Sequence, residues 1–412
     1  MSGRDVEGSR DAAQLEEWLS VGDLLCLEIL GTQFAIRWGR SVTAEQQQHM
    51  RSAWARCAAS GAPAIPPLPK EPTESLPFSA SVAFSSQKYD GGTLALQAAS
   101  FEELAENLTS RLTVAAILEN AGELMMLHAC GVASRETGAV VALVARSGTG
   151  KTTAASVLAG KYGYVSDETV AVAPDGSVLP YPKPLSVKQE PGEPKRQVGP
   201  DELGLQPAPP KPFLQSIVLL DRVEAKDRVE VKDRVEGDRQ AAPVLRQVPL
   251  ADALLALIPD SSSQAEVDEP LQSLCRLIDF VGGVWQVTYA EAADLPAALE
   301  PLFRKRRRSR PRWEAPEPET ESGYIPEGRV RRARPKDAVA VDGDLLVMLD
   351  AEIVRLGGIG PAIWEATARA VPLDELAEEV GDVHGRPEGY RAAVGAAVEQ
   401  LIAKSILEPG GE

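Results

Sequence analysis

Residues 143–160 have the sequence LVARSGTGKTTAASVLAG, and this stretch decides the fold of the chain. An apolar run ends in a loop of small residues, after which Lys151 and Thr152 open an alanine-rich helix. Backbone N–H groups of such a loop can converge on one point, where the positive end of the helix dipole also acts. Gly148 and Gly150 permit backbone conformations that other residues avoid. The stretch therefore predicts a phosphate-binding loop between a buried strand and a helix.

The loop follows the pattern G-x-x-x-x-G-K-[S/T] except at its first position, where Ala145 replaces glycine. Lys151 can supply positive charge to the outer phosphates, and the Thr152 hydroxyl can ligate Mg²⁺. We therefore predict nucleotide binding by a set of loop and helix residues: Ser147, Gly148, Thr149, Gly150, Lys151, Thr152 and Thr153. The loop by itself does not distinguish a kinase from an ATPase or a GTPase.

Length and composition describe a globular protein of two or three domains. The chain has 412 residues, 44% of them hydrophobic, and a formal net charge of -17. This charge argues against a general nucleic-acid binder, which needs a broad basic face. No apolar run is long enough to span a bilayer, and the polar N-terminus lacks a signal-peptide core. We therefore expect a cytoplasmic protein that binds neither nucleic acid nor membrane.

Cysteine and histidine usage limits the kinds of metal site. The four cysteines are scattered without paired spacing, which favours reduced core thiols over a disulfide framework. Three histidines are too few to suggest a His-rich metal centre. One of the three, His128, stands shortly before the phosphate loop.

Around the loop, apolar strands alternate with helices. Strand-like runs are expected at 124–133, 139–145, 215–222 and 284–290, and several more within 162–187. This rhythm is typical of an α/β sheet covered on at least one face. Upstream, the sequence predicts a strand pair around Gly31, a helix at 44–60, a hairpin formed by 79–86 and 92–100, and a long helix that Ser100 and Glu103 begin as a capping box.

Two charged segments interrupt the predicted elements. Residues 221–240 repeat the unit DRVE(A/V)K, which we interpret as an expanded surface loop or extended ribbon, with partner binding as the alternative. Residues 304–327 are basic, then acidic, and contain prolines, which favours a solvated tether between domains. A basic patch that reaches bound nucleotide or an acidic peptide is the alternative for this segment.

Several motifs around the loop resemble the HPr kinase/phosphorylase family. His128 precedes a small-residue strand, a hairpin and the loop, and the strand after the helix ends in Asp167-Glu168. The segment PYPKPLSV at 180–187 also resembles shorter relatives, and the likeness covers about residues 124–300. It departs from the longer members, whose further Glu- and Gly-containing motif has no counterpart here. The related kinases are oligomeric, which makes a homo-oligomer one expectation of the resemblance, but the sequence itself does not fix the oligomeric state.

The resemblance implies a kinase mechanism in which three residues are catalytic: Asp167, His128 and Lys151. A carboxylate beside the terminal phosphate can accept the proton of an attacking hydroxyl, and we choose Asp167 for that base. His128 would hold Asp167 or the phosphoryl group. Thr152, with Asp167 or Glu168, would bind Mg²⁺. Simpler interpretations are an exposed acidic turn for Asp167-Glu168 and a core position for His128. Lys183 and Lys188 are candidate phosphate contacts, with surface lysines as the simpler interpretation.

The last eighty residues predict short strands joined by a tight turn at Asp350-Ala351, followed by three short helices, a winged-helix-like order. They resemble PqqD-like peptide chaperones, also called RiPP recognition elements, in the run LLVMLDAEIVRLGGIGPAIWEATARAVPLDELAEEV at 345–380. The resemblance implies a leader peptide that adds as a strand to the sheet and packs on the last helix. Candidate peptide-binding residues are Ile353, Val354, Arg355, Leu356, Tyr390, Val394 and Leu401; core packing is the alternative for each. The balance of charges on the final helix disfavours DNA binding.

Together these features predict an α/β protein with a P-loop kinase core of the HPr kinase/PEP carboxykinase type. The expected divisions are an N-terminal α+β region at 1–115, the kinase core at 116–303, the linker at 304–327 and a PqqD-like domain at 328–412. The leading hypothesis is an ATP- and Mg²⁺-dependent kinase that phosphorylates a Ser or Thr of a ribosomally made precursor peptide. The alternatives are a nucleotide-switched peptide chaperone and a kinase of a small molecule such as free serine.

Overall fold

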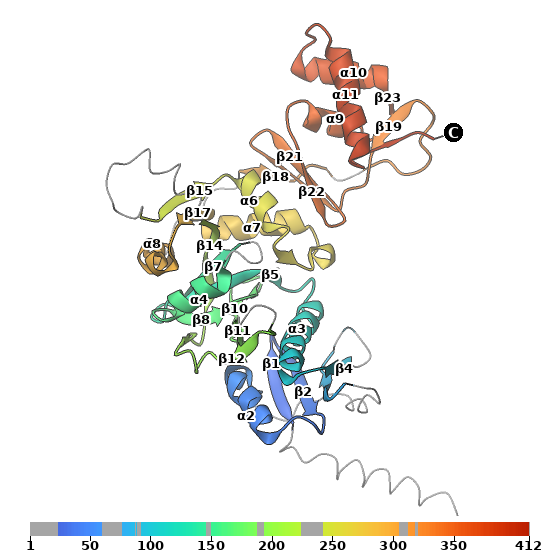
Figure 1. Ribbon diagram of the computed structural model, residues 1–412. Helices are drawn as coiled ribbons and strands as arrows, with labels where there is room; N and C mark the ends of the chain where they lie inside the picture. The colour runs from blue at the N-terminus through green and yellow to red at the C-terminus, as the bar shows by residue number, and fades with distance from the viewer. Residues whose placement is uncertain are drawn as a thin grey trace, which may run out of the picture.

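The computed structural model describes residues 24–59, 76–86, 88, 92–145, 150–187, 193–223, 242–304, 312–317 and 320–411. These residues form three units that follow one another along an elongated molecule (Figure 1). The N-terminal unit begins at residue 24, the central unit at 124 and the C-terminal unit at 312. The molecule is mixed α/β, and its largest sheet contains parallel strands. In the described part of the chain, no helix combines the length and apolarity that crossing a membrane requires.

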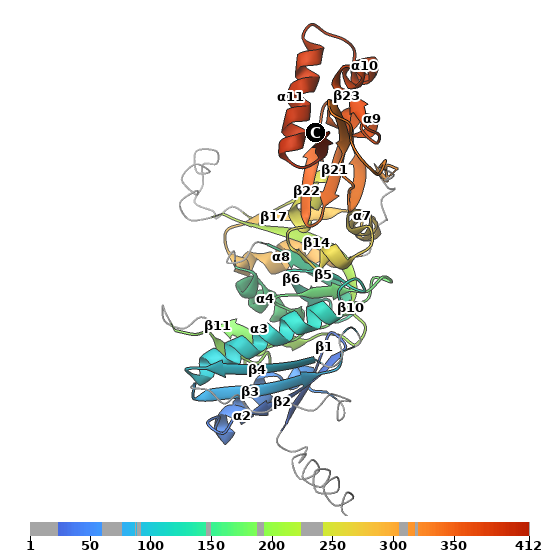
Figure 2. The same cartoon turned by 90° about the vertical axis from the view of Figure 1, so that its right-hand side faces the viewer.

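Within its described residues, the N-terminal unit forms a four-stranded antiparallel sheet with two α-helices. Its elements are β1 (Leu25–Ile29), β2 (Thr32–Trp38), α2 (Ala44–Ala53), β3 (Phe78–Phe84), β4 (Gly92–Ala98) and α3 (Phe101–Glu119). The predicted strand pair around Gly31 is confirmed, and this glycine has a φ of 82°. Figure 2 shows α3 lying across the sheet.

Helix α3 begins as its sequence predicts. The Ser100 hydroxyl accepts a hydrogen bond from the Glu103 amide, while the Glu103 carboxylate accepts one from the Ala99 amide. Leu104, Leu108 and Leu112 recur every four residues and are fully buried in the core of the N-terminal unit. The boundary expected after residue 115 falls inside this helix, so α3 as a whole belongs with the N-terminal sheet.

The central unit contains a seven-stranded sheet of order β13-β8-β6-β7-β14-β17-β15. The strands are β6 (Ala129–Ala133), β7 (Ala139–Val144), β8 (Gly163–Ser166), β13 (Gln206–Pro207), β14 (Phe213–Arg222), β15 (Val244–Val248) and β17 (Val284–Tyr289). Four short strands, β5 (Met125–Leu127), β9 (Val170–Val172), β10 (Val178–Leu179) and β16 (Ser261–Ser262), form a second sheet, and β11 (Leu185–Val187) pairs with β12 (Arg196–Val198). The run at 124–133, expected as one strand, is therefore two strands in two sheets, with His128 at the break.

Helices cover both faces of the large sheet. Alternate residues of β7 face opposite sides: Val140, Ala142 and Val144 lie in one core cluster, and Ala139, Val141 and Leu143 lie in another. The first cluster includes α6 (Leu250–Leu257) and α7 (Pro270–Val281), and the second includes α4 (Lys151–Ala159) and α8 (Leu295–Leu299). Burial on both faces explains why the strand is continuously apolar.

The described part of the C-terminal unit contains two small sheets and three α-helices. Strands β18 (Trp313–Glu314), β20 (Asp337–Val341), β21 (Asp344–Leu349) and β22 (Glu352–Leu356) form one sheet; β19 (Arg329–Arg332), β23 (Val371–Pro372) and β24 (Leu407–Pro409) form the other. The helices are α9 (Gly360–Ala366), α10 (Leu373–His384) and α11 (Tyr390–Ala403). The tight turn at Asp350 is present, with a φ of 48°.

The C-terminal sheet is packed against the central unit. Val339, Val341, Leu346 and Met348 belong to the same core cluster as α6 and α7. The Asp337 carboxylate accepts hydrogen bonds from the backbone amide and the side-chain amide of Gln272 in α7, at 3.0 and 2.9 Å. The two units are therefore joined by a buried interface.

The linker does not run free where it is described, which corrects the expectation of a solvated tether. Trp313 pairs with Val341 in the C-terminal sheet, and its indole N–H donates to Asp279 of α7 at 2.8 Å. Further along, the Glu321 amide donates to the Ala368 carbonyl. Most of the DRVE repeat, at 224–241, and the basic residues 305–311 lie outside the described residues.

Candidate functional site

The stretch predicted to bind phosphate connects the end of β7 with the start of α4. Ser147, Gly148 and Thr149 fall outside the described residues, so their predicted contacts stay predictions. Gly150 has a φ of 99°, a conformation that L side chains rarely adopt, and α4 starts at the next residue. The strand, the glycine turn and the helix N-terminus thus have the order that the sequence predicts.

Lys151 is buried and spans the base of the loop. Its ammonium group donates to the carbonyl of Ala145, on the other side of the loop. Burial lowers the pKa of Lys151, while the nearby carboxylates of Asp260, Glu168 and Asp167 oppose that shift. The cation is therefore held at the Ala145 carbonyl, among acidic groups. Thr153, also predicted to bind nucleotide, is exposed on α4.

Asp167 lies beside the first turn of α4. Strand β8 runs in the same direction as β7, because each is antiparallel to β6, so both strands end at one edge of the sheet. Asp167 directly follows β8, is 6% exposed, and accepts a hydrogen bond through Oδ2 from the Thr152 hydroxyl at 3.4 Å. A buried carboxylate and a hydroxyl thus meet next to the loop.

The donors present suit Mg²⁺ in part. Thr152 and Asp167 place two hard oxygen ligands side by side, and Mg²⁺ typically takes few protein ligands while keeping water and phosphate oxygens. The Glu168 side chain is 38% exposed and forms an ion pair with Lys183 at 3.1 Å. Among the described residues, no group of three or more His, Cys, Asp and Glu side chains is arranged to hold a metal ion.

His128 stands where β5 gives way to β6. Its backbone amide donates to the Asp260 carbonyl at 2.7 Å, which ties it to the segment after α6. Burial and the charge of Lys151 lower the pKa of His128, against the opposing influence of Glu168 and Asp260. The histidine predicted from sequence therefore lies within the electrostatic reach of both Lys151 and Glu168.

Sequence reasoning missed three charged residues at this site. Lys183, expected on the surface, is 3% exposed and pairs with Asp167 and Glu168. Asp260 lies near Lys151 and His128. Arg222, at the carboxyl end of β14, has a guanidinium nitrogen 3.8 Å from the position that a Gly150 Cβ would take. A lysine inside the apolar, proline-flanked run LPYPKPLSV was the one signal in the sequence.

The four cysteines fit the expectation of reduced thiols. All four are free, and three of them, Cys57, Cys130 and Cys275, are buried. Burial raises the pKa of each of these three thiols to about 12. They are inert core residues and offer no thiolate to a metal or a substrate.

The predicted peptide-binding residues occupy two different environments. Ile353 packs against the core cluster shared with the central unit, and Arg355 forms ion pairs with Asp344 and, through its Nη1, with Asp252 of α6 at 2.8 Å. The remaining residues, Val354, Leu356, Tyr390, Val394 and Leu401, belong to the core cluster of the C-terminal unit. Of these, Leu356, Val394 and Leu401 are buried, so their side chains serve the core of the unit in this structure.

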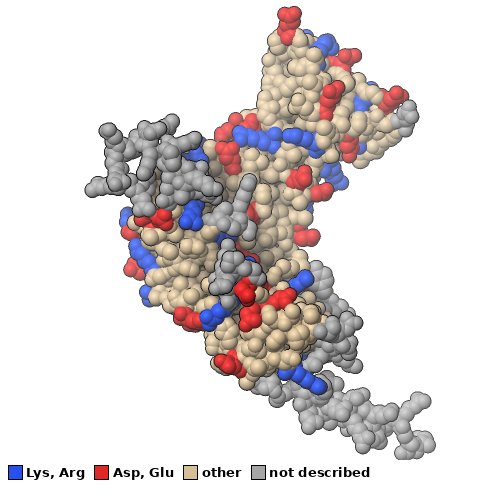
Figure 3. Space-filling model, in the orientation of Figure 1, with Lys and Arg blue, Asp and Glu red and all other residues tan. Residues whose placement is uncertain are grey.

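Charges of both signs lie on the described surface, and the absence of nucleic-acid binding stays a prediction. On the face shown in Figure 3, basic and acidic side chains are interspersed over the described residues. Arg391 of α11, the basic residue considered for a recognition helix, is paired with Glu378.

No protein-family model matches the chain, and no curated protein matches it. Among solved structures, the chain is similar to the Hpr(Ser) kinase/phosphatase from Coxiella burnetii, with 12% sequence identity and a TM-score of 0.20. The match covers 43% of this chain and 92% of that chain. A TM-score this low carries no argument about fold or activity, so function must be argued from the residues of this chain.

Proposed function

We propose that the protein is an ATP-dependent kinase that phosphorylates a Ser or Thr hydroxyl of a ribosomally made precursor peptide. The observation that carries the proposal is the contact between Thr152, on the first turn of α4, and the buried carboxylate of Asp167. Lys151 lies on the same turn, and its ammonium group donates to the carbonyl of Ala145 at the end of β7. A phosphate-binding loop, a cation and a carboxylate at one sheet edge are what phosphoryl transfer to a hydroxyl requires.

The chemistry assigns one role to each group. The acceptor oxygen forms a bond to the γ-phosphorus while the bond from that phosphorus to the bridging oxygen breaks, and the electron pair leaves with ADP. The hydroxyl proton passes to Asp167, acting as general base. Thr152, with Asp167 or Glu168, would hold Mg²⁺, which when bound neutralises charge on the phosphates. Lys151 and Arg222 supply further positive charge on the loop side.

A peptide substrate is supported by the position of β22. This strand is at the edge of its sheet, with β21 as its neighbour among the described strands. Because the hairpin turn has two residues, we expect the pair Leu349–Glu352 to exchange both hydrogen bonds, which turns the amides of Ile353 and Arg355 outward. An extended peptide could add to these groups and gain affinity from backbone hydrogen bonds.

The direct test is incubation with γ-labelled ATP, Mg²⁺ and candidate precursor peptides. We expect labelled peptide with the wild-type protein, and a loss of transfer of about 1,000-fold in Asp167→Asn, because general-base catalysis contributes 10²- to 10⁴-fold. ATP affinity should change little. If peptides bind but neither protein transfers label, the protein is a nucleotide-switched chaperone. Labelling of free serine in place of peptide would indicate a small-molecule kinase.

A further inference from the structure

Lys183 is buried next to the candidate site, and its ammonium group has an acceptor for each of its three N–H donors. Its Nζ lies 3.2 Å from Asp167 Oδ1, 3.1 Å from Glu168 Oε2 and 3.3 Å from the Pro184 carbonyl oxygen. An ammonium group has three donors, and here three acceptors surround it. A lysine is almost never this buried unless it is paired, so the two carboxylates account for its burial.

The two oxygens of Asp167 have different surroundings. Oδ1 faces Lys183 and accepts a hydrogen bond from the Tyr164 hydroxyl at 3.1 Å. Oδ2 faces Thr152, on the loop side. The protein interior therefore holds one oxygen, and the other is directed toward the place where phosphate is expected.

The segment that carries Lys183 is held in turn by the N-terminal unit. The hydroxyls of Tyr181 and Thr113 of α3 are 2.7 Å apart and hydrogen-bonded, and both side chains are buried. The ring of Tyr181 lies 6.5 Å from that of Trp54 in the core of the N-terminal unit. The Lys183 amide donates to the Tyr181 carbonyl, which links the two residues directly.

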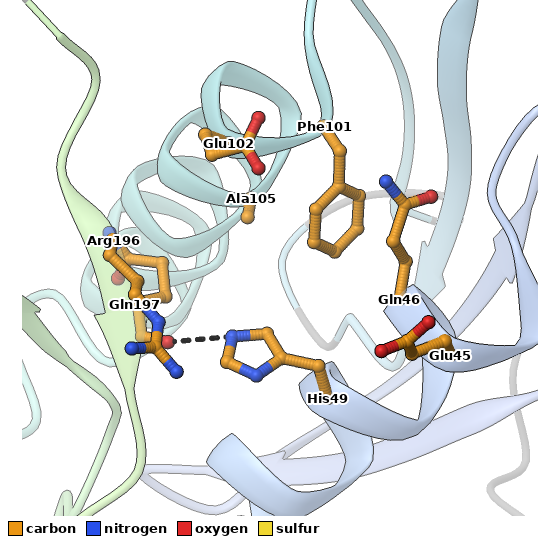
Figure 4. Close-up of a pocket in the computed structure, with 8 residues that line it drawn as sticks. All are labelled: Glu45, Gln46, His49, Phe101, Glu102, Ala105, Arg196 and Gln197. Atoms are coloured by element: carbon orange, nitrogen blue, oxygen red, sulfur yellow. Dashed lines mark hydrogen bonds between the residues drawn. The ribbon is translucent and has the colours of Figure 1, made fainter.

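A second contact holds the hairpin that follows Lys183. His49 of α2 reaches the carbonyl of Gln197 in β12 at 3.0 Å, across a shallow cavity of about 250 Å³ (Figure 4). Glu106 of α3 accepts a hydrogen bond from the Lys195 amide at 3.1 Å. The N-terminal unit thus holds both Tyr181 and the β11–β12 hairpin, on either side of the Lys183 turn.

We propose that Lys183 is a positioning residue for Asp167, and that the N-terminal unit serves to hold Lys183 in place. The ammonium group fixes Oδ1, so that Oδ2 stays turned toward Thr152 and the nucleotide. The catalytic part of this inference rests on the proposed kinase function. The geometric part, a carboxylate oriented by a buried lysine, can be tested without activity.

The test compares Lys183→Met, which keeps the aliphatic stem, with Lys183→Arg, which keeps the charge. We expect Lys183→Met to lower kcat by about 100-fold with little change in the KM for ATP, because a small misplacement of a reacting group has effects of that size. Lys183→Arg should recover at least about tenfold of the loss. Lys161→Met is the matched control: Lys161 is an exposed lysine of the same unit, paired with Glu300, and its loss should leave kcat unchanged.

A crystal structure of Lys183→Met gives the readout that does not depend on activity. We expect the Asp167 carboxylate to rotate, so that Oδ2 no longer faces Thr152. An unmoved carboxylate, or an unchanged kcat in folded Lys183→Met, overturns the inference. If the wild type transfers no phosphoryl group, the proposed function fails. The geometric part of the inference then depends on whether the Asp167 carboxylate rotates in Lys183→Met.

Thr113→Val tests the part played by the N-terminal unit and stands in if Lys183→Met does not fold. It removes the hydrogen bond to Tyr181 without touching the site, and we expect kcat to fall by about fivefold, the equivalent of one hydrogen bond. A kcat equal to wild type in folded Thr113→Val overturns the inference.

Discussion

Lys183 in the central unit and Arg332 in the C-terminal unit are both 3% exposed, yet they are stabilised in different ways. Lys183 lies between the carboxylates of Asp167 and Glu168. Arg332 lies 3.7 Å from the centre of the Trp364 ring and donates to the Thr320 hydroxyl and to the carbonyls of Glu317 and Trp364.

Under the proposed function, this difference separates a cation that orients a catalytic group from one that stabilises the fold. A buried ion pair is a weak source of net stability, because desolvation offsets much of the attraction. Net stability is therefore a poor explanation for two carboxylates beside the predicted phosphate loop. Orienting them for the proposed phosphoryl transfer explains the arrangement better. Arg332, in contrast, donates to the carbonyls of Glu317 in the linker and Trp364 in α9 and covers the indole, which stabilises the unit directly. Burial lowers its pKa, but an arginine remains charged.

The largest effect on stability is expected at Arg332. Arg332→Met should destabilise the C-terminal unit by about 3 kcal/mol, because two carbonyls and a hydroxyl lose their donor. Chemical denaturation measures the loss, and kcat for a short acceptor peptide should stay at the wild-type value. Arg369→Met, which removes an arginine paired with Glu375 and Glu379 at the surface, is the control. A large loss of kcat in folded Arg332→Met would show that Arg332 also affects the reaction, which contradicts a purely stabilising role.

Local structure on both sides of the predicted phosphate loop followed from the sequence, because it depends on short-range patterns. The alternation in β7, the cap at Ser100 and the glycine before α4 each act within a few residues. The pairing of Asp167 with Thr152 also followed, since parallel strands end at the same edge of a sheet.

Both buried cations were missed for a common physical reason. A lysine or arginine is assigned to the surface unless its partners are known, and these partners come from distant positions. Residues 317 and 320 reach Arg332 only after the linker folds back on the unit, as Arg332 donates to both. Lys183 meets Asp167 across a turn whose shape depends on Tyr181 and the N-terminal unit. The break at His128 was missed for a similar reason. β5 and β6 follow each other in sequence, and they belong to different sheets because β5 pairs with β9 while β6 pairs with β7.

A double-mutant cycle should separate the pair Lys183–Asp167 from its surroundings. Each single variant, Lys183→Met or Asp167→Asn, leaves a buried charge with a partner removed, so each should destabilise the central unit. The loss of stability in the double variant should be about 2 kcal/mol smaller than the sum of the two single losses, the size expected for residues in contact. Thermal or chemical unfolding measures this coupling. Strict additivity would mean that the pair is not formed in solution.

Two hydroxyls allow a comparison at the level of one hydrogen bond. Tyr164→Phe removes a donor to Asp167, and Thr320→Val removes an acceptor of Arg332. Each should cost about 1 kcal/mol of stability. We expect kcat to fall in Tyr164→Phe but not in Thr320→Val, because of these two hydroxyls only that of Tyr164 contacts Asp167, the proposed base. Kinase and unfolding assays on both variants measure these effects. A lower kcat in Thr320→Val would contradict the prediction.

The smallest effect is expected where a cation is paired but exposed. Arg355 joins β22 to α6 through Asp252, with both side chains close to half exposed. Solvent screening limits such a pair, so Asp252→Asn should change the free energy of unfolding by less than about 1 kcal/mol and should change it even less at high salt. Because this ion pair lies on the strand proposed to bind peptide, its loss should alter peptide affinity, measured by calorimetry, more than stability. A stability loss comparable to that of Arg332→Met would show that exposure, the property used to rank these cations, does not govern their contribution.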